Sequence, residues 1–147
     1  MAAGRRHPDK TLLALAVQQP WAELILRGVK TLEVRSQPTR VRGTIYLYAS
    51  QRISTLQAAG EITHRYGLEL ESLPKGVLVG TVDIVGCRPC TSDDVHAAGV
   101  PSDLLIRRQA WILDRAERLP SPLPVQFLPY GVWFYPFHRK GARQRGV

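Results

Sequence analysis

The stretch that decides the fold runs from QPWA at residues 19–22 to GVKTLEVR at residues 28–35. It carries an aromatic ring, a lysine, a carboxylate and an arginine within one passage from helix to turn to strand. Lys30, Glu33 and Arg35 alternate with apolar residues there. A plain hydrophobic core does not need this set, because buried polar groups require partners. The stretch therefore indicates a functional site as well as an element of the fold.

The first half of this stretch has the pattern of a helix over residues 20–27. Pro20 suits the first turn, where its missing N–H is not needed. Trp21 and Leu24 recur at helical spacing, and Gly28 follows where a helix end favours a residue that tolerates positive φ. The sequence predicts that the helix ends just before Gly28.

The second half alternates polar and apolar residues over 31–35, which predicts a short strand. The alternation places Leu32 on one face and both Glu33 and Arg35 on the other. Lys30 falls in the connection between helix and strand. We therefore expect Lys30 to lean over the face that carries Glu33 and Arg35.

The remaining elements are expected in this order: strands at 12–17, 44–49, 77–87, 123–127 and 131–137, a helix over 54–66, and a capped short helix from 91 to 98. Gly80 and Gly86 indicate bends or bulges within the strand 77–87. Residues 102–119 fit either a helix or a strand by periodicity. About six short strands with two or three helices, and no regular alternation, predict an α+β fold built as a small mixed β-barrel.

Composition and charge limit the class of protein. The 147 residues predict one domain, and 44% of them are hydrophobic. The formal net charge is +8, and sixteen of the twenty cationic residues are arginine. Arginine binds phosphate with a planar fork of donors, which favours a polyanionic partner. A codon bias that places arginine at solvated positions explains the same charge, and both interpretations stay open. No apolar run reaches the length of a membrane span.

The ends of the chain are basic and polar. We expect residues 1–10 to form a flexible N-terminus, residues 11–137 the domain, and residues 138–147 a flexible basic tail. The pair Arg5-Arg6 faintly resembles the start of an export signal, but the following residues are polar and the apolar run is short. The sequence thus predicts a cytoplasmic protein.

The two cysteines, Cys87 and Cys90, are spaced C-x-x-C. A structural zinc site needs two further ligands, and no second C-x-x-C or paired histidine motif is present in the sequence. A redox role would need a thioredoxin-like βαβ pattern, which is absent. We predict ordinary reduced thiols, no metal site and no cofactor.

Taken together, these motifs resemble the ASCH domain family, whose fold is related to PUA domains. The family signature G-x-K-x-x-E-x-R matches residues 28–35, and the characteristic Q-P-W-A precedes it. Weaker similarities follow in order at residues 48–50, 80–85, 110–113 and 131–134, so that the resemblance covers residues 12–137. It implies a β-barrel with helices at its side, a cleft between barrel and first helix, and a strand rather than a helix at 110–113.

For function, the resemblance implies an RNA- or nucleotide-binding module. Some related small proteins hydrolyse N4-acetylcytidine or cut RNA. The set expected for the amidohydrolases is a lysine, a threonine three residues later and an acidic residue on a later strand. This chain has Lys30 and a candidate acid in Asp83, but Glu33 stands where the threonine is expected. The presumed nucleophile is therefore missing.

The cleft residues have clear chemistry for a nucleic acid. Lys30 and Arg35 would hold phosphate, Trp21 would stack on a base, and Glu33 would accept from a base amino group. Each has a plainer explanation, since Trp21 also suits a core anchor, and Glu33 with Arg35 also suits a surface ion pair. Arg40 and Arg42 on the next loop extend the positive surface, and we include Ser50 among the ligand-binding residues.

The sequence leaves three functions open. The first is binding of RNA, single-stranded nucleic acid or a nucleotide-like small molecule in a basic cleft. The alternative is a small hydrolase of an N4-acylated cytidine or of RNA, with Lys30, Glu33 and Asp83 as catalytic residues. Glu33 beside Lys30 is expected to raise the pKa of that lysine, which favours binding over general-base chemistry. The third is a protein-interaction module that uses the proline-rich stretch 119–129.

Overall fold

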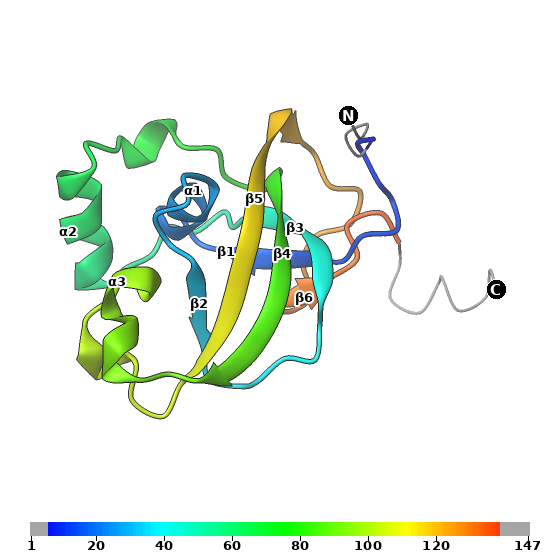
Figure 1. The fold of residues 1–147 in the computed structure, drawn as a ribbon. Coiled ribbons are helices and arrows are strands. Elements are labelled where there is room, and N and C mark those ends of the chain that lie inside the picture. Colours follow the sequence, from blue (N-terminus) through cyan, green and yellow to red (C-terminus); the bar gives the residue numbers. More distant parts are fainter. Residues whose placement is uncertain (1–5, 139–147) are drawn as a thin grey trace.

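Six strands form one curled mixed sheet, as the computed structural model of residues 6–138 shows (Figure 1). The strands are β1 (Ala14–Val17), β2 (Leu32–Arg35), β3 (Gly43–Ala49), β4 (Val77–Pro89), β5 (Gln109–Leu123) and β6 (Trp133–Phe134). Their order in the sheet is β2-β5-β4-β3-β1-β6. Only β1 and β3 pair in parallel among these strands. The sheet is therefore a half-barrel whose two edges are β2 and β6.

Three α-helices accompany the sheet: α1 (Trp21–Leu26), α2 (Gln57–Arg65) and α3 (Val95–Ala98). Short 3₁₀ turns lie at Leu70–Ser72, Ser92–Asp94 and Ser102–Leu104. Figure 1 shows α2 and α3 together beyond one side of the sheet, with β6 toward the other. The predicted α+β class, with about six strands and two or three flanking helices, is confirmed.

The two longest strands, β4 and β5, are bent where glycine interrupts β4. Their register shifts between Leu78 and Gly80 and again between Ile84 and Gly86. These are the bulges that the two glycines predicted. At Gly80 the backbone also approaches its neighbours closely, because a Cβ there would overlap Leu26 of α1 and the carbonyl oxygen of Glu117 in β5. This close approach lets α1 pack against the bend in the sheet.

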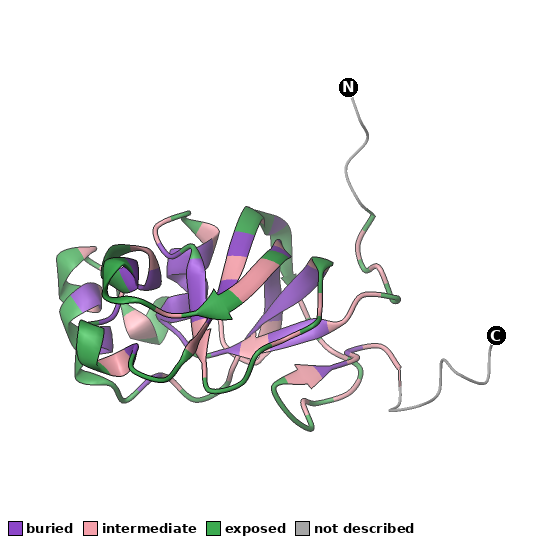
Figure 2. Cartoon of the chain, turned by 60° about the horizontal axis from the view of Figure 1, so that its bottom comes forward, coloured by how far each residue is buried: buried purple, intermediate pink, exposed green. Residues whose placement is uncertain are grey.

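The main hydrophobic core lies between the sheet and the helices, and includes Leu15, Leu24, Leu47 and Val82. A smaller cluster contains Tyr46, Tyr48 and Phe134. Figure 2 shows the buried residues along the strands, whereas much of α2 is exposed. The packing fixes α1 inside the curl of the sheet, which is where the sequence predicted a site.

Aromatic stacking connects β6, at one edge of the sheet, with β5, which lies next to the other edge strand. Trp111 of β5 stacks on Trp133 of β6, with 5.5 Å between the ring centroids and 11° between the ring planes. The indole N–H of Trp111 donates to the carbonyl of Gln37, at 2.9 Å. Since β6 has only two residues and pairs with β1 alone, this stack gives β6 a contact with β5 in addition to its pairing with β1.

Several predicted boundaries differ from the structure. The helix predicted over 54–66 spans Gln57–Arg65, and the ambiguous segment 102–119 becomes a 3₁₀ turn followed by β5. The strand predicted at 123–127 is wrong, because β5 already ends at Leu123 and an irregular segment follows. Of the strand predicted at 131–137, only Trp133–Phe134 forms. Proline at 120, 122 and 124 obscured a strand that continues through the first two of them.

The predicted flexible ends lie partly outside the described residues. Of residues 1–10, those from 6 onward are described, and the backbone N–H of Asp9 donates to the hydroxyl of Tyr46 at 2.6 Å. Of the tail 138–147, only His138 is described. Within residues 6–138, no helix is both long and apolar enough to cross a membrane.

We expect Gly80→Ala to destabilise the protein by about 1–3 kcal/mol, the usual cost of overpacking, because the new methyl group meets backbone as well as side-chain atoms. Urea unfolding would measure the change. Gly60→Ala is the matched control: it lies inside α2 with open space around the added Cβ, and helix propensity predicts a gain of about 0.5–1 kcal/mol. Equal effects of the two substitutions would contradict the close approach at Gly80.

Candidate ligand-binding cleft

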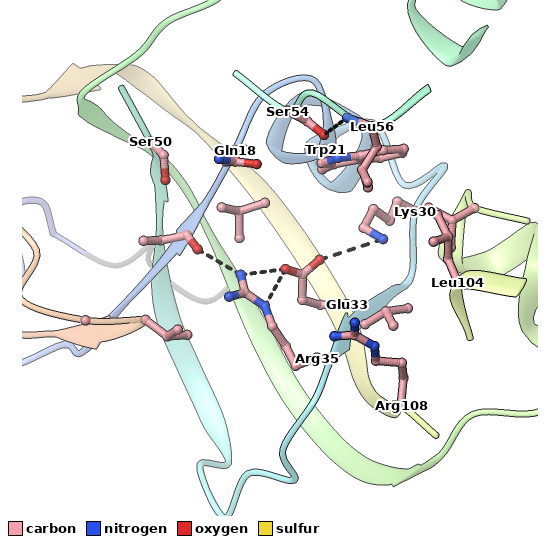
Figure 3. Close-up of a pocket in the computed structure, with 16 residues that line it drawn as sticks. Gln18, Trp21, Lys30, Glu33, Arg35, Ser50, Ser54, Leu56, Leu104 and Arg108 are labelled. Carbon is pink, nitrogen blue, oxygen red and sulfur yellow. Dashed lines mark hydrogen bonds and ion pairs between the residues drawn. The ribbon is translucent and has the colours of Figure 1, made fainter. Parts of the chain in front are cut away.

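A cleft of about 550 Å³ opens between α1, β2 and the segment before β6 (Figure 3). Its lining comes from residues far apart in sequence: Ala16, Val17, Gln18, Trp21, Lys30, Glu33, Val34, Arg35, Ser50, Ser54, Leu56, Val100, Leu104, Arg108, Gly131 and Val132. Five predicted site residues are brought together here, namely Trp21, Lys30, Glu33, Arg35 and Ser50. The predicted cleft between first helix and sheet thus has a geometric counterpart.

The start of α1 is fixed by a buried glutamine. Gln19 is 1% exposed; its side-chain oxygen accepts from the backbone N–H of Glu23 at 3.0 Å, and its amide donates to the carbonyl of Pro74 at 3.0 Å. Trp21, the first residue of α1, is itself buried and belongs to the main core. Trp21 is therefore a core anchor, and it also lines the cleft.

A second contact holds α1 against β5. Both oxygens of Glu23 accept from the guanidinium of Arg118 at 2.9 Å, and one accepts from Arg27 at 2.8 Å. Burial raises the pKa of Glu23, but the hydrogen bonds from Arg118 and Arg27 outweigh burial and lower the pKa overall. The ionised carboxylate thus fixes the helix that carries Trp21.

The turn after α1 sets the position of Lys30. Gly28 has φ +73°, as the sequence predicted for the helix end. The backbone N–H groups of Val29 and Lys30 both donate to the carbonyl of Leu24, at 3.0 and 3.1 Å. This turn directs the Lys30 side chain into the protein, where the residue is only 4% exposed.

Three groups surround the Lys30 ammonium. Its Nζ donates to the carbonyl of Ala98 at 2.6 Å, lies 3.7 Å from Oε1 of Glu33, and stands 5.3 Å from the ring centroid of Trp21. Burial lowers the pKa of Lys30, and although Glu33 raises it, the net pKa is below the usual value of 10.5. The expected upward effect of Glu33 on this pKa is present, but desolvation outweighs the one carboxylate.

Glu33 is buried and Arg35 is partly buried, so they form a shielded pair rather than the surface pair considered from sequence. Arg35 reaches Oε2 of Glu33 through Nε at 2.9 Å and Nη2 at 2.7 Å. Its Nη2 also donates to the carbonyl of Ala16 at 2.9 Å, and its guanidinium stands 5.7 Å from the ring centroid of Trp111. Arg35 therefore links the edge strand β2 to β1 across the open side of the half-barrel.

The Lys30 ammonium donates to the end of α3, and the 3₁₀ turn Ser92–Asp94 that leads into α3 is capped at Thr91. Both oxygens of Asp94 accept from Arg88 at 2.8 Å, and one accepts from the backbone N–H of Thr91 at 2.7 Å. The hydrogen bond from Arg88 lowers the pKa of Asp94 to about 2. The capping box predicted at Thr91 is confirmed. It fixes the short helix that ends at the Ala98 carbonyl.

Three predicted site residues lie elsewhere. Arg40 and Arg42 are exposed on the loop before β3, and Arg42 donates to the carbonyls of Thr39 and Val41. Asp83 accepts from Thr44 at 2.6 Å and from Arg115 at 2.9 Å. None of the three is among the residues that line the cleft. The structure does not bring Asp83 to Lys30.

The cleft also contains residues that the sequence did not suggest. Arg108 is a third cation of the lining, and Gln18 adds an amide. Val100, Leu104 and Val132 add apolar surface. The signal for Arg108 was its place just before the strand expected at 110–113. Periodicity does not predict which strands pair, so the sequence could not show that Arg108 lies near Arg35.

No group of three or more His, Cys, Asp or Glu residues within 6–138 is arranged to hold a metal ion. Cys87 and Cys90 form no disulfide. Burial raises the pKa of Cys90, against the nearby charges of Arg88, Lys30 and Arg108, which lower it. Lys30 and Arg108 thus lie close enough to Cys90 to act on the same thiol.

The described features define a small half-barrel domain with a partly basic cleft at its first helix. Residues 15–119 match the model of the ASCH domain. The chain belongs to the ASCH domain family, which is associated with RNA binding. The resemblance noted from the signature at 28–35 is confirmed.

Two curated relatives share part of the sequence. Activating signal cointegrator 1 of Homo sapiens is 38% identical over 80 residues, which are 50% of this chain and 14% of that protein. The Mus musculus protein of the same name is 36% identical over the same shares. The match spans only about one seventh of these relatives, so their similarity concerns a single segment.

Solved structures support the fold over nearly the whole chain. The ASCH protein of Zymomonas mobilis has a TM-score of 0.59 and 14% identity, covering 93% of this chain and 94% of its own. A serine-to-alanine variant of that protein has a TM-score of 0.58 and 15% identity, covering 94% of this chain and 95% of its own. At this identity the similarity shows the fold alone.

The lowered pKa of Lys30 has a consequence for stability. Between that lowered pKa and the usual value of 10.5, the unfolded chain binds the proton more tightly than the native protein, so Lys30 makes the native state gain stability as pH rises. We expect the free energy of unfolding of the wild type to rise relative to Lys30→Met between neutral pH and about pH 10.

Urea unfolding of both proteins at several pH values measures this difference. Taking the difference removes the titration of groups common to both proteins, such as Tyr48, whose pKa burial raises. If the free energy of unfolding of the wild type instead fell relative to that of Lys30→Met as pH rose, Glu33 rather than burial would control the pKa of Lys30.

Proposed function

We propose that the cleft binds single-stranded RNA, or a nucleotide-like ligand, by taking one unpaired base between α1 and β2. The observation that carries this proposal is the set of three cations, Lys30, Arg35 and Arg108, that lines the cleft with one carboxylate, Glu33, beside the ring of Trp21. Membership of a family associated with RNA binding supports the same chemistry.

The size of the cleft suits one nucleotide unit. Its volume of about 550 Å³ falls within the range of about 300–1,000 Å³ for small-molecule sites. RNA is read in sequence mainly through unpaired bases that stack on aromatic rings and expose their edges. A single-stranded segment presents such a base, whereas a duplex must first open.

The lining offers both apolar surface and hydrogen-bond donors to a base. Trp21, Leu104 and Val132 supply the apolar part. Arg35 donates through Nε to Glu33 and through Nη2 to the carbonyl of Ala16. Its Nη1 has no partner among the described residues. The exposed amide of Gln18 adds a donor and an acceptor. These groups suit the carbonyl-rich edge of a base.

We expect Lys30→Met to weaken RNA binding about tenfold, since a hydrogen bond to a charged group contributes about 1.5–3 kcal/mol. Fluorescence anisotropy with short single-stranded RNA, single-stranded DNA and duplex DNA at two salt concentrations measures the effect. Arg115→Gln is the control for lost charge, because Arg115 is exposed and pairs with Asp83 outside this cleft. We expect it to leave affinity within about twofold.

Absence of binding to all three nucleic acids would refute RNA binding, and absence of binding to mononucleotides as well would refute the whole proposal. Binding that both variants weaken equally would assign it to general charge, and binding that neither variant weakens would assign it to surfaces outside the cleft. Circular dichroism of each variant confirms that the fold is intact before affinities are compared.

Hydrolysis of an N4-acylated cytidine is the second candidate. The observation that favours it is the buried Lys30, whose pKa is lowered, because a neutral amine is a base. The nearby carboxylate is Glu33, whereas Asp83 is directed to Thr44 and Arg115. In this reaction water would add to the acyl carbon, and the products would be the free cytidine and the carboxylic acid.

We expect wild-type protein to leave both N4-acetylcytidine and labelled RNA intact, because the cleft has no threonine at position 33 and a glutamate there is already bonded to Arg35. Chromatography of the nucleoside and a denaturing gel of the RNA detect any product. Product that appears with wild type and disappears with Lys30→Met would replace the binding proposal with an enzymatic one.

A further inference from the structure

We propose that Arg108 is the phosphate-binding residue of the cleft, so that the ligand is a nucleotide unit held with its base inside and its phosphate at Arg108. This inference rests on the proposed function and deepens it, because it assigns the sites of base and phosphate. The sequence motif suggested Lys30 and Arg35 for the phosphate instead.

Lys30 and Arg35 already have anionic and carbonyl partners. Lys30 bonds to Ala98 and faces Glu33, while Arg35 bonds to Glu33 twice and to Ala16 once. Lys30 is also 4% exposed. A phosphate that took either side chain would leave the buried Glu33 with less positive charge, which is costly in a region shielded from water. These two cations are therefore better fitted to the uncharged base.

Arg108 differs from Lys30 and Arg35 in its exposure and in its side-chain partners. It is exposed, and its guanidinium makes no hydrogen bond or ion pair with any other described residue. Its backbone is nevertheless fixed on both sides: its N–H donates to the carbonyl of Leu105 at 3.2 Å, and its carbonyl accepts from Cys90 at 2.9 Å. A fixed backbone with an uncommitted guanidinium suits capture of a phosphate by a planar fork of donors.

Sheet pairing places Arg108 beside the signature residues. Gln109, the first residue of β5, pairs with Arg35 at the end of β2, so Arg108 lies one residue outside that pair. Figure 3 shows Arg108 and Ser50 on opposite sides of Glu33. A phosphate at Arg108 thus lies at the rim on the β5 side, while the base occupies the space toward Trp21.

The test compares nucleosides with their 5′- and 3′-monophosphates by titration calorimetry, using wild type, Arg108→Gln and Arg107→Gln. Arg107 is the matched control, since it is the adjacent exposed arginine and does not line the cleft. We expect one of the monophosphates to bind wild type and Arg107→Gln about tenfold more tightly than the nucleoside. Arg108→Gln is expected to lose that preference and to keep its affinity for the nucleoside.

The same variants are then compared on single-stranded RNA across salt concentrations. Loss of one phosphate contact lowers the slope of log affinity against log salt by about 0.7 for a single strand, and we expect this in Arg108→Gln alone. A wild type that prefers no phosphate, a preference that survives in Arg108→Gln, or equal losses in both variants would overturn the inference while leaving the proposed function intact. Failure of wild type to bind nucleosides, nucleotides and RNA alike would overturn both.

Discussion

One carboxylate holds the cleft together. Glu33 accepts from Arg35 on one oxygen and faces Lys30 with the other, so a single buried negative charge fixes two cations from the turn and the edge strand. Because Arg35 also bonds to the Ala16 carbonyl, the same carboxylate helps to tie β2 to β1 where no backbone ladder joins them. Removing one partner from a buried pair of this kind costs about 3–5 kcal/mol.

This network explains why a positively charged cleft coexists with a compact core. Burying Lys30 is unfavourable for its charged form, as its lowered pKa shows, and the Ala98 carbonyl, Glu33 and the Trp21 ring offset part of that cost. The donors of Lys30 and Arg35 are consequently held in position before any ligand arrives. Pre-positioned donors lose little freedom on binding, and this makes them suited to recognition.

Short-range pattern predicted the parts of this site that are local in sequence. The helix, the Gly28 turn and the alternation of β2 placed Lys30, Glu33 and Arg35 correctly, because each depends on residues within a few positions. Two features of the site could not be predicted from the sequence. The net pKa of Lys30 depends on burial by the whole fold, and the presence of Arg108 in the cleft depends on the pairing of β2 with β5, whose paired residues lie more than seventy positions apart. The prolines within β5 likewise concealed its length, since the strand signal is weakened by residues that cannot donate to a ladder.

The three tryptophans of the chain all stand at or next to the cleft. Trp21 lines it, Trp111 lies beneath Arg35, and Trp133 stacks on Trp111 directly after the lining residue Val132. The intrinsic tryptophan fluorescence of the protein therefore originates at this one region. A ligand that enters the cleft comes close to these tryptophans, so their fluorescence reports on its binding.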